Sequence, residues 1–199
     1  MKKIFSHIGL FIICFFASFF LFFNYIGDIL YRFMVPGVSL YLSLITFTAY
    51  ILFIISNFII YKKVNRIFLD ILAAVYFIVV LGFTFNKIQY SGINLNPFTL
   101  INDFNEYFRH TLLALTGNLL MYLPLGVYSR YRFNIKSQIQ IIGFLIYIIL
   151  VECIQYFMNV GILDINDILA NTFGFICGVF LYQIVANKQK NKIDIASLS

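Results

Sequence analysis

The chain has 199 residues, of which 62% are hydrophobic and 11% are charged, and its formal net charge is +6. A soluble domain carries about 25% charged residues, so this composition excludes a water-soluble globular protein and makes the lipid bilayer the solvent for most of the chain. The basic residues fall in short clusters between apolar segments and form no single patch, which argues against nucleic acid as a partner.

Six segments are long and apolar enough to cross a membrane as helices, which takes about 20 residues each. The predicted spans are Ile8–Ile26, Val38–Tyr61, Ile67–Phe85, Thr111–Tyr128, Gln138–Met158 and Asp167–Ala186. The apolar stretch of the first is too long for a cleavable signal, so we predict a retained helix. The predicted fold class is all-α, a polytopic transmembrane helix bundle forming a single domain over residues 1–187. A disordered basic tail is expected over residues 188–199.

The distribution of basic residues predicts how the spans are oriented. With six spans both termini share one side, and eleven of the fourteen Lys and Arg residues then fall on that side. The positive-inside rule places this side in the cytoplasm. These eleven are Lys2, Lys3, Lys62, Lys63, Arg66, Arg130, Arg132, Lys136, Lys188, Lys190 and Lys192.

One long loop, residues 86–110, is predicted on the opposite, outer side. Asn96 followed by Pro97 is typical of a helix N-cap with proline in the first turn. Apolar residues then recur at spacings of three and four, as in an amphipathic helix lying on the bilayer surface. A helix packed over the bundle is the alternative. The apolar positions are Leu100, Ile101, Phe104, Tyr107 and Phe108.

Three predicted spans each carry an unusual polar residue near their outer ends. At the helical rise, Glu152 lies about 9 Å deep, Asn118 about 10 Å and Asn171 about 6 Å. A carboxylate at membrane depth is costly and usually faces a protein interior, where it serves a function. Because the three depths agree, we predict one shared polar pocket. The alternative is that these groups only join helices through hydrogen bonds.

Helical spacing extends this pocket along two spans. Gln155 and Asn159 follow Glu152 at spacings of three and four, and Asp167, Asn171, Gly174 and Gly178 form a stripe on the last span. The two glycines permit close helix packing, so they can bring this stripe close to the face that carries Glu152. Packing alone is the other interpretation of these glycines.

Two further features have both a structural and a functional interpretation. Gly117, Asn118 and Pro124 interrupt the fourth span, as in spans that border a binding site, although a simple proline kink is the alternative. Asp164 and Asp167 precede the last span, where a carboxylate caps a helix N-terminus. Together they could instead bind a substrate amine or a divalent cation, or act as an acid/base pair.

No metal site is predicted. No histidine or cysteine near Asp164 and Asp167 completes a zinc set, and the three cysteines share no ligand spacing. No cofactor is indicated either.

The motifs in this order resemble the VanZ-like membrane protein family over residues 94–186. They are Asn96-Pro97-Phe98, Gly117-Asn118, Pro124-Leu125-Gly126, Glu152-Cys153-Ile154-Gln155, Asp164-Ile165-Asn166-Asp167-Ile168 and Asn171-Thr172-Phe173-Gly174. The resemblance implies a bacterial multi-pass protein of the cytoplasmic membrane whose signature includes Asn118, Pro124, Gly126, Glu152, Gln155, Asp164, Asp167, Asn171 and Gly174.

One position departs from the family pattern. Many relatives carry an arginine a few residues before the first aspartate, whereas residues 159–163 contain none. If that arginine pairs with a carboxylate, Asp164 or Glu152 needs another partner here, and Arg109 is the nearest candidate.

Three functions follow as hypotheses. The first is binding of a lipid head group, a cell-wall precursor or a glycopeptide, because the founding family member is associated with resistance to the lipid-tailed glycopeptide teicoplanin. In it, Asn118, Glu152, Gln155, Asp164, Asp167 and Asn171 bind the ligand, and Pro124, Gly126, Gly174 and Gly178 shape the helices. The second is an intramembrane enzyme acting on a lipid-linked substrate, with Glu152 as general base and with Asp164 and Asp167 holding a cation. The third is a proton-coupled transporter that uses Glu152 as its relay.

Overall fold

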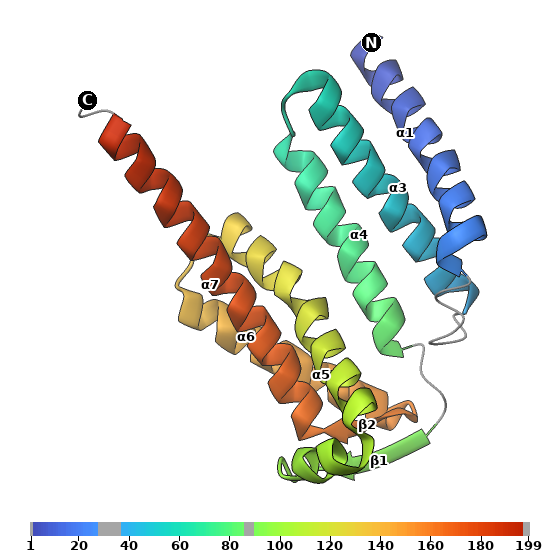
Figure 1. The fold of residues 1–199 in the computed structure, drawn as a ribbon, viewed down its shortest axis with the longest axis vertical. Coiled ribbons are helices and arrows are strands. Elements are labelled where there is room, and N and C mark those ends of the chain that lie inside the picture. The colour runs from blue at the N-terminus through green and yellow to red at the C-terminus, as the bar shows by residue number, and fades with distance from the viewer. Residues whose placement is uncertain (1, 28–36, 86–89, 197–199) are drawn as a thin grey trace. The chain divides into compact units, whose positions relative to one another are not determined.

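The computed structural model describes residues 2–27, 37–85 and 90–196 of the chain. Contacts within the chain divide it into two compact units, Met1–Lys87 and Ile88–Ser199. Each unit has its own set of packed helices, which Figure 1 shows in the colours of the chain. The single domain expected over residues 1–187 stays a prediction. Asp28, Arg32 and Lys87 lie outside the described residues.

The first unit contains three apolar helices. Helix α1 (Lys2–Leu21) continues into the π-helical turn η1 (Phe22–Ile26), and α3 (Val38–Tyr61) and α4 (Arg66–Phe85) follow. Its core forms around Cys14, Tyr50 and Phe53. Ser18 is fully buried and donates a hydrogen bond of 2.8 Å to the Ile45 carbonyl, so α1 and α3 are joined by a polar contact as well.

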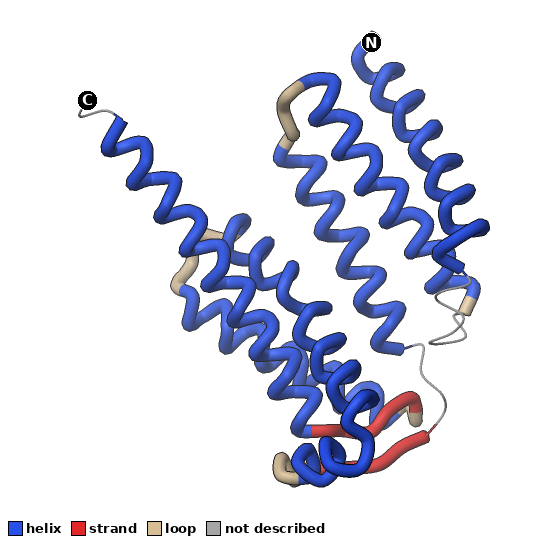
Figure 2. Tube along the Cα trace, in the orientation of Figure 1, coloured by secondary structure: helices blue, strands red, loops and turns tan. Residues whose placement is uncertain are grey.

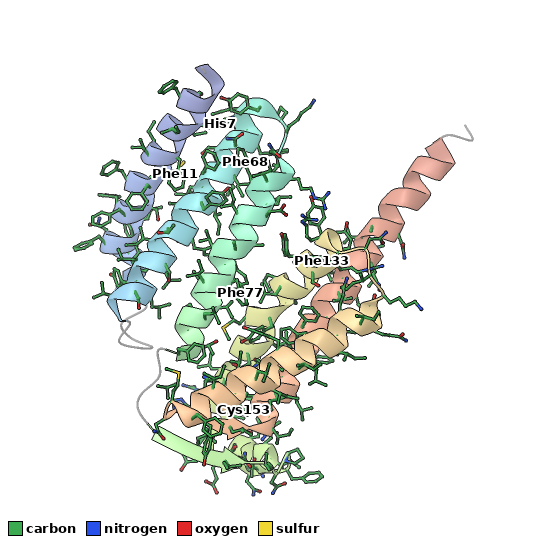
Figure 3. The ribbon with its side chains drawn as sticks, turned by 180° about the vertical axis from the view of Figure 1, so that it is seen from behind. His7, Phe11, Phe68, Phe77, Phe133 and Cys153 are labelled. Carbon is green, nitrogen blue, oxygen red and sulfur yellow. The ribbon has the colours of Figure 1, made fainter. Side chains whose placement is uncertain are left out.

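Aromatic rings fill one end of this unit. Figure 3 shows His7, Phe11 and Phe68 there, on α1 and α4. The His7 ring lies 5.6 Å from the Phe68 ring, and the Asn57 amide lies 3.0 Å from its Nδ1 atom. Asn57 is itself buried, so this contact satisfies a polar group inside an apolar bundle.

The second unit begins with strand β1 (Tyr90–Asn94) and helix α5 (Thr99–Arg132). Helix α6 (Ser137–Phe157), strand β2 (Val160–Asp164) and helix α7 (Ile165–Ala196) complete it. The stacked rings of Phe144 and Phe175, 4.2 Å apart, form its apolar core together with Tyr122.

The all-α prediction needs one correction, because β1 and β2 pair as a parallel ribbon in which Asn94 lies opposite Asp164. Parallel strands require a long crossover connection, and here it consists of α5 and α6. Figure 2 shows the ribbon in red, with α5 and α7 leaving it. Helices α5 and α7 therefore run in the same direction, and α6 leads the chain from the far end of α5 back to the ribbon. We call this end of the unit the ribbon end.

Glycines allow α5 and α7 to lie in close contact. A Cβ atom on Gly174 would collide with the Leu119 carbonyl oxygen, one on Gly178 with that of Leu123, and one on Gly126 with that of Phe175. Sequence reasoning placed the glycines of α7 against the helix that carries Glu152, which is α6, and this was wrong. They pack against α5.

Five of the six predicted spans lie within helices that are long and apolar enough to cross a membrane, and the other, Gln138–Met158, extends one residue beyond such a helix. Large apolar side chains such as Phe5, Phe16 and Leu113 point outward in numbers that a soluble protein rarely exposes. Surfaces of this kind suit contact with acyl chains, so the chain is a multi-span membrane protein.

Two helices differ from their predicted extents. Helix α7 runs to Ala196, so residues 188–196 are helical where a disordered tail was predicted, because no glycine or proline ends the helix there. The fourth span is not interrupted at Gly117, Asn118 or Pro124. Within α5 the non-helical backbone falls at Tyr107, which separates the predicted surface helix from the span.

Candidate functional site

A hydrogen bond between Asn118 and Asp167 joins α5 to α7 near the ribbon end. The Asn118 Nδ2 atom donates to the Asp167 Oδ1 atom over 2.7 Å. Asp167 lies in the first turn of α7, where the helix dipole favours a negative charge. The structure thus brings together two residues that sequence reasoning assigned to one site from different spans.

Glu152 and Gln155 are the most deeply buried polar residues of α6. They are 2% and 1% exposed, one turn apart on the same face. A Cβ atom on Gly161 of β2 would lie 3.4 Å from the Gln155 Cβ atom, so the ribbon covers Gln155 directly. The expectation that Glu152 faces the protein interior is confirmed by this burial.

Asn171 occupies the stripe of α7 that faces α5. It follows Asp167 by four residues and precedes Gly174 by three, and these two contact Asn118 and Leu119 respectively. Its side chain is 4% exposed. Asn171 is therefore buried at the level of Asn118, as the depth argument predicted.

Asp164 caps α7 and fastens the ribbon. Its Oδ1 atom accepts the Asn166 backbone N–H over 2.8 Å, and its two carboxylate oxygens lie 3.1 and 3.2 Å from the Asn94 Nδ2 donor. The capping interpretation of Asp164 therefore holds. Asn94 and Asn166 supply the hydrogen-bond donors that pair with this carboxylate in place of the missing arginine. Arg109 is exposed on α5.

Two residues that sequence reasoning missed, Asn94 and Thr99, complete this knot of hydrogen bonds together with Asn166 of the motif before the last span. Asn94 Nδ2 and Asn166 Nδ2 both donate to the Thr99 Oγ1 atom, over 2.9 and 3.1 Å. The hydroxyl of Thr99 in turn donates to the Asn96 carbonyl. The starts of α5 and α7 are thereby tied together. The one available signal was the repetition of asparagine immediately before two apolar helices.

The cap predicted at Asn96 lies two residues too early, because the residue before the regular helix is Phe98, which makes no side-chain cap hydrogen bond. The Asn96 Oδ1 atom accepts the Phe98 backbone N–H over 3.1 Å, as a capping residue does, although the regular helix begins at Thr99. At the break in α5, the Thr111 hydroxyl donates to the carbonyls of Asp103 and Tyr107 over 3.0 and 3.1 Å. The surface helix and the span are thus held at a defined bend.

Some predicted members lie apart from the polar cluster. Asn159 is exposed in a left-handed turn (φ 54°) between α6 and β2, so it does not share the buried face of Glu152. Pro124 is exposed on a continuous helix, and His110 is exposed near the bend of α5. Cys153, labelled in Figure 3, lies half-buried beside Glu152 on α6.

The chemistry of the cluster is that of carboxylates and primary amides. Among the described residues, no group of three His, Cys, Asp or Glu side chains is placed to hold a metal ion. We use the name polar cluster for the buried or bonded residues that the sequence predicted to share one site. Of these, Asn118 and Asp167 are joined by a hydrogen bond. The members are Asn118, Glu152, Gln155, Asp167 and Asn171. Such groups can bind hydrogen-bond donors and can exchange a proton.

Comparison with known proteins identifies the family. The VanZ/LLP1 family profile matches residues 47–186, a longer stretch than the 94–186 expected from the motifs. Protein VanZ of Enterococcus faecium is 26% identical over 132 residues, which cover 61% of this chain and 76% of the relative. No solved structure matched the chain. On the extent of the profile match, the chain belongs to the VanZ/LLP1 family.

Proposed function

We propose that the chain is a multi-pass protein of the bacterial cytoplasmic membrane that binds a lipid head group, a cell-wall precursor or a glycopeptide at the polar cluster. The observation that carries this proposal is the burial of Glu152, 2% exposed, on a helix whose composition suits the bilayer. A carboxylate at the centre of a membrane helix costs about 2.5–3.5 kcal/mol on insertion scales. Such a residue is retained where it has a use.

The neighbours of Glu152 support binding over simple helix association. A hydrogen bond between membrane helices contributes about 0.6 kcal/mol on average, which is less than the cost of burying the carboxylate. Gln155, Asn118, Asp167 and Asn171 add further polar groups at the same end of the unit. The hydrogen bonds of Asn94, Asp164 and Asn166 already join the starts of α5 and α7.

In this proposal the ribbon end faces the outside of the cell. The opposite end of the unit carries Arg130, Arg132 and Lys136 around the turn between α5 and α6, and positive residues favour the cytoplasmic side. The polar cluster then opens toward the outer leaflet, where cell-wall precursors and glycopeptides are encountered. The family resemblance extends the proposal to a lowered susceptibility to teicoplanin.

A susceptibility assay tests this function. Cells that lack the gene are complemented with the wild-type chain, with Glu152→Gln, with Asp167→Asn, or with Glu106→Gln as a matched control. Glu106 is an exposed glutamate on the surface helix of α5, outside the polar cluster. We expect the wild type and the control to raise the inhibitory concentration of teicoplanin, and the two cluster variants to lose that effect.

Membrane levels of every variant are compared by immunoblot, so that loss of protein is not mistaken for loss of binding. Equal teicoplanin susceptibility in deleted and complemented cells would contradict the resistance part of the proposal. Equal susceptibility of wild type and both cluster variants, at equal protein levels, would contradict the role of the polar cluster.

A further inference from the structure

Asn171 contains a buried hydrogen-bond acceptor that no described residue satisfies. Its side chain is 4% exposed, and among the residues that the structure describes none donates to its Oδ1 atom. A buried acceptor without a donor is unfavourable, and native proteins retain few of them. Asn171 therefore needs an explanation that packing does not provide.

The position of Asn171 directs this acceptor toward the polar cluster. On the same stripe of α7, Asp167 accepts a hydrogen bond from Asn118, and Gly174 packs against Leu119. Asn171 lies between these two contacts, at the level where α5 and α7 are in closest contact. Asn171 thus lies about one helical turn beyond Asp167 on α7.

The buried atom left without a described partner at this level is a hydrogen-bond acceptor. The carboxylate of Asp167 and the carbonyl oxygen of Asn171 accept hydrogen bonds, and the amide of Asn118 already donates to Asp167. A carboxylate offers about four acceptor sites in all. A ligand that fits these groups must bring N–H or O–H donors.

Basic side chains lie elsewhere in the second unit. Arg130, twelve residues beyond Asn118 on α5, is about 18 Å further along the helix at the usual rise. Lys136 and Lys188 lie at that same end, and Arg109 is exposed. Among the described residues of this unit, none of the Lys and Arg side chains is therefore placed to neutralise a phosphate beside Asn171.

We propose that the polar cluster recognises a primary amine, whose ammonium N–H groups donate to the Asn171 Oδ1 atom and to the Asp167 carboxylate. This inference rests on the proposed function and narrows its ligand to molecules with a free amino group. The amine could belong to a lipid head group or to the peptide part of a cell-wall precursor. Both sources present the same ammonium chemistry to Asn171.

Two pairs of probes test the inference on the full chain. The two members of each pair differ in whether their nitrogen can donate a hydrogen bond as an ammonium group. The lipid pair is phosphatidylethanolamine and phosphatidylcholine, which share a phosphate but differ in N–H groups. The peptide pair is Lys-D-Ala-D-Ala with free amines and the same peptide with both amines acetylated. Retention of each lipid by the purified protein is measured by mass spectrometry, and binding of each peptide by calorimetry.

We expect the amine form of at least one pair to bind at least about tenfold more tightly than the capped form, because hydrogen bonds to charged groups are among the strong ones. The pair that shows the preference identifies the source of the amine. Asn171→Leu should remove most of that preference, and Asn171→Asp should keep it.

Thr172→Val is the matched control. The Thr172 hydroxyl is likewise buried without a described hydrogen-bond partner, but it lies on the next position of the helix and thus on another face. This variant should keep the full amine preference. If it weakens the preference as much as Asn171→Leu does, the effect comes from packing of α7 and the inference is wrong.

Failure of the inference can be told apart from failure of the proposed function. If amine and capped probes bind equally and Glu152→Gln abolishes both, the cluster binds a ligand but does not select an amine. If none of the four probes binds, both the amine inference and binding at this cluster lose their support. Thermal unfolding of Asn171→Leu at or above the wild-type temperature verifies that the variant is folded.

Discussion

The close contact between α5 and α7 predicts that Gly174→Ala destabilises the protein. A Cβ atom at this position would lie 2.9 Å from the Leu119 Cα atom and nearer still to its carbonyl oxygen. Because the obstacle is backbone, no side-chain rotation relieves the clash, and the two helices must separate. Overpacking of this kind costs about 1–3 kcal/mol.

Thermal unfolding of the purified protein in detergent measures this effect. In a chain of this size each kcal/mol corresponds to roughly 2–4 °C in the unfolding temperature, so we expect a fall of several degrees. Gly143→Ala on α6 and Gly117→Ala on α5 are matched controls, because no atom lies within 4 Å of the Cβ position at either glycine. These two should be neutral or stabilising by about 0.5–1 kcal/mol, since alanine favours the helix.

The outcome that refutes the packing argument is equally definite. If Gly174→Ala unfolds at or above the wild-type temperature while the controls behave as expected, α5 and α7 have room for a methyl group. The glycines of α7 would then not be required for packing, and the close contact between α5 and α7 would need a different description.

Three further predictions follow from individual hydrogen bonds. Asp164→Ala should lower the free energy of unfolding by about 0.5–2 kcal/mol, as the loss of a helix cap does. Chemical denaturation measures this change, and an unchanged free energy of unfolding would mean that the Asn166 amide finds another acceptor. Asn118→Ala and Asp167→Ala should show a favourable coupling of about 0.6–2 kcal/mol in a double-mutant cycle of unfolding stability. If the effects of the two substitutions on stability simply add, the 2.7 Å contact contributes nothing to stability. Ser18→Ala should reduce the thermal stability of the first unit by about 0.6 kcal/mol, because the hydrogen bond to the Ile45 carbonyl is lost. A thermal stability equal to that of the wild type would contradict this prediction.

Sequence reasoning located the spans well because their signal is local. Val38–Tyr61 coincides with α3 at both ends, and Gln138–Met158 differs from α6 by one residue at each end. In a bilayer the backbone must satisfy its own hydrogen bonds, so an apolar stretch of sufficient length folds as a helix. The turn at Asn96 is equally local, although α5 starts two residues later than the predicted cap implied.

The ribbon was missed because its stability depends on partners that are distant in sequence. β1 and β2 contain five residues each and are separated by sixty-five, and neither stands out as a strand by itself. Their pairing places Asn94 beside Asp164, and only then do Thr99 and Asn166 become members of one hydrogen-bonded knot. The wrong packing partner predicted for the glycines of α7 has the same cause. A stripe of small residues indicates that a helix packs closely against another helix, but it does not identify which one.

The sequence alone determined that this chain is a membrane protein and where its six apolar helices lie. A common level for Glu152, Asn118 and Asn171 stays a prediction. Composition and helical periodicity are properties of single segments, so predictions based on them do not require knowledge of the fold. Only the tertiary structure decided that Asp164 is a cap, that Asp167 is bonded to Asn118, and that α7 packs its glycines on α5. Each of these depends on which segments meet in space, and that is set by the parallel ribbon that aligns α5 with α7.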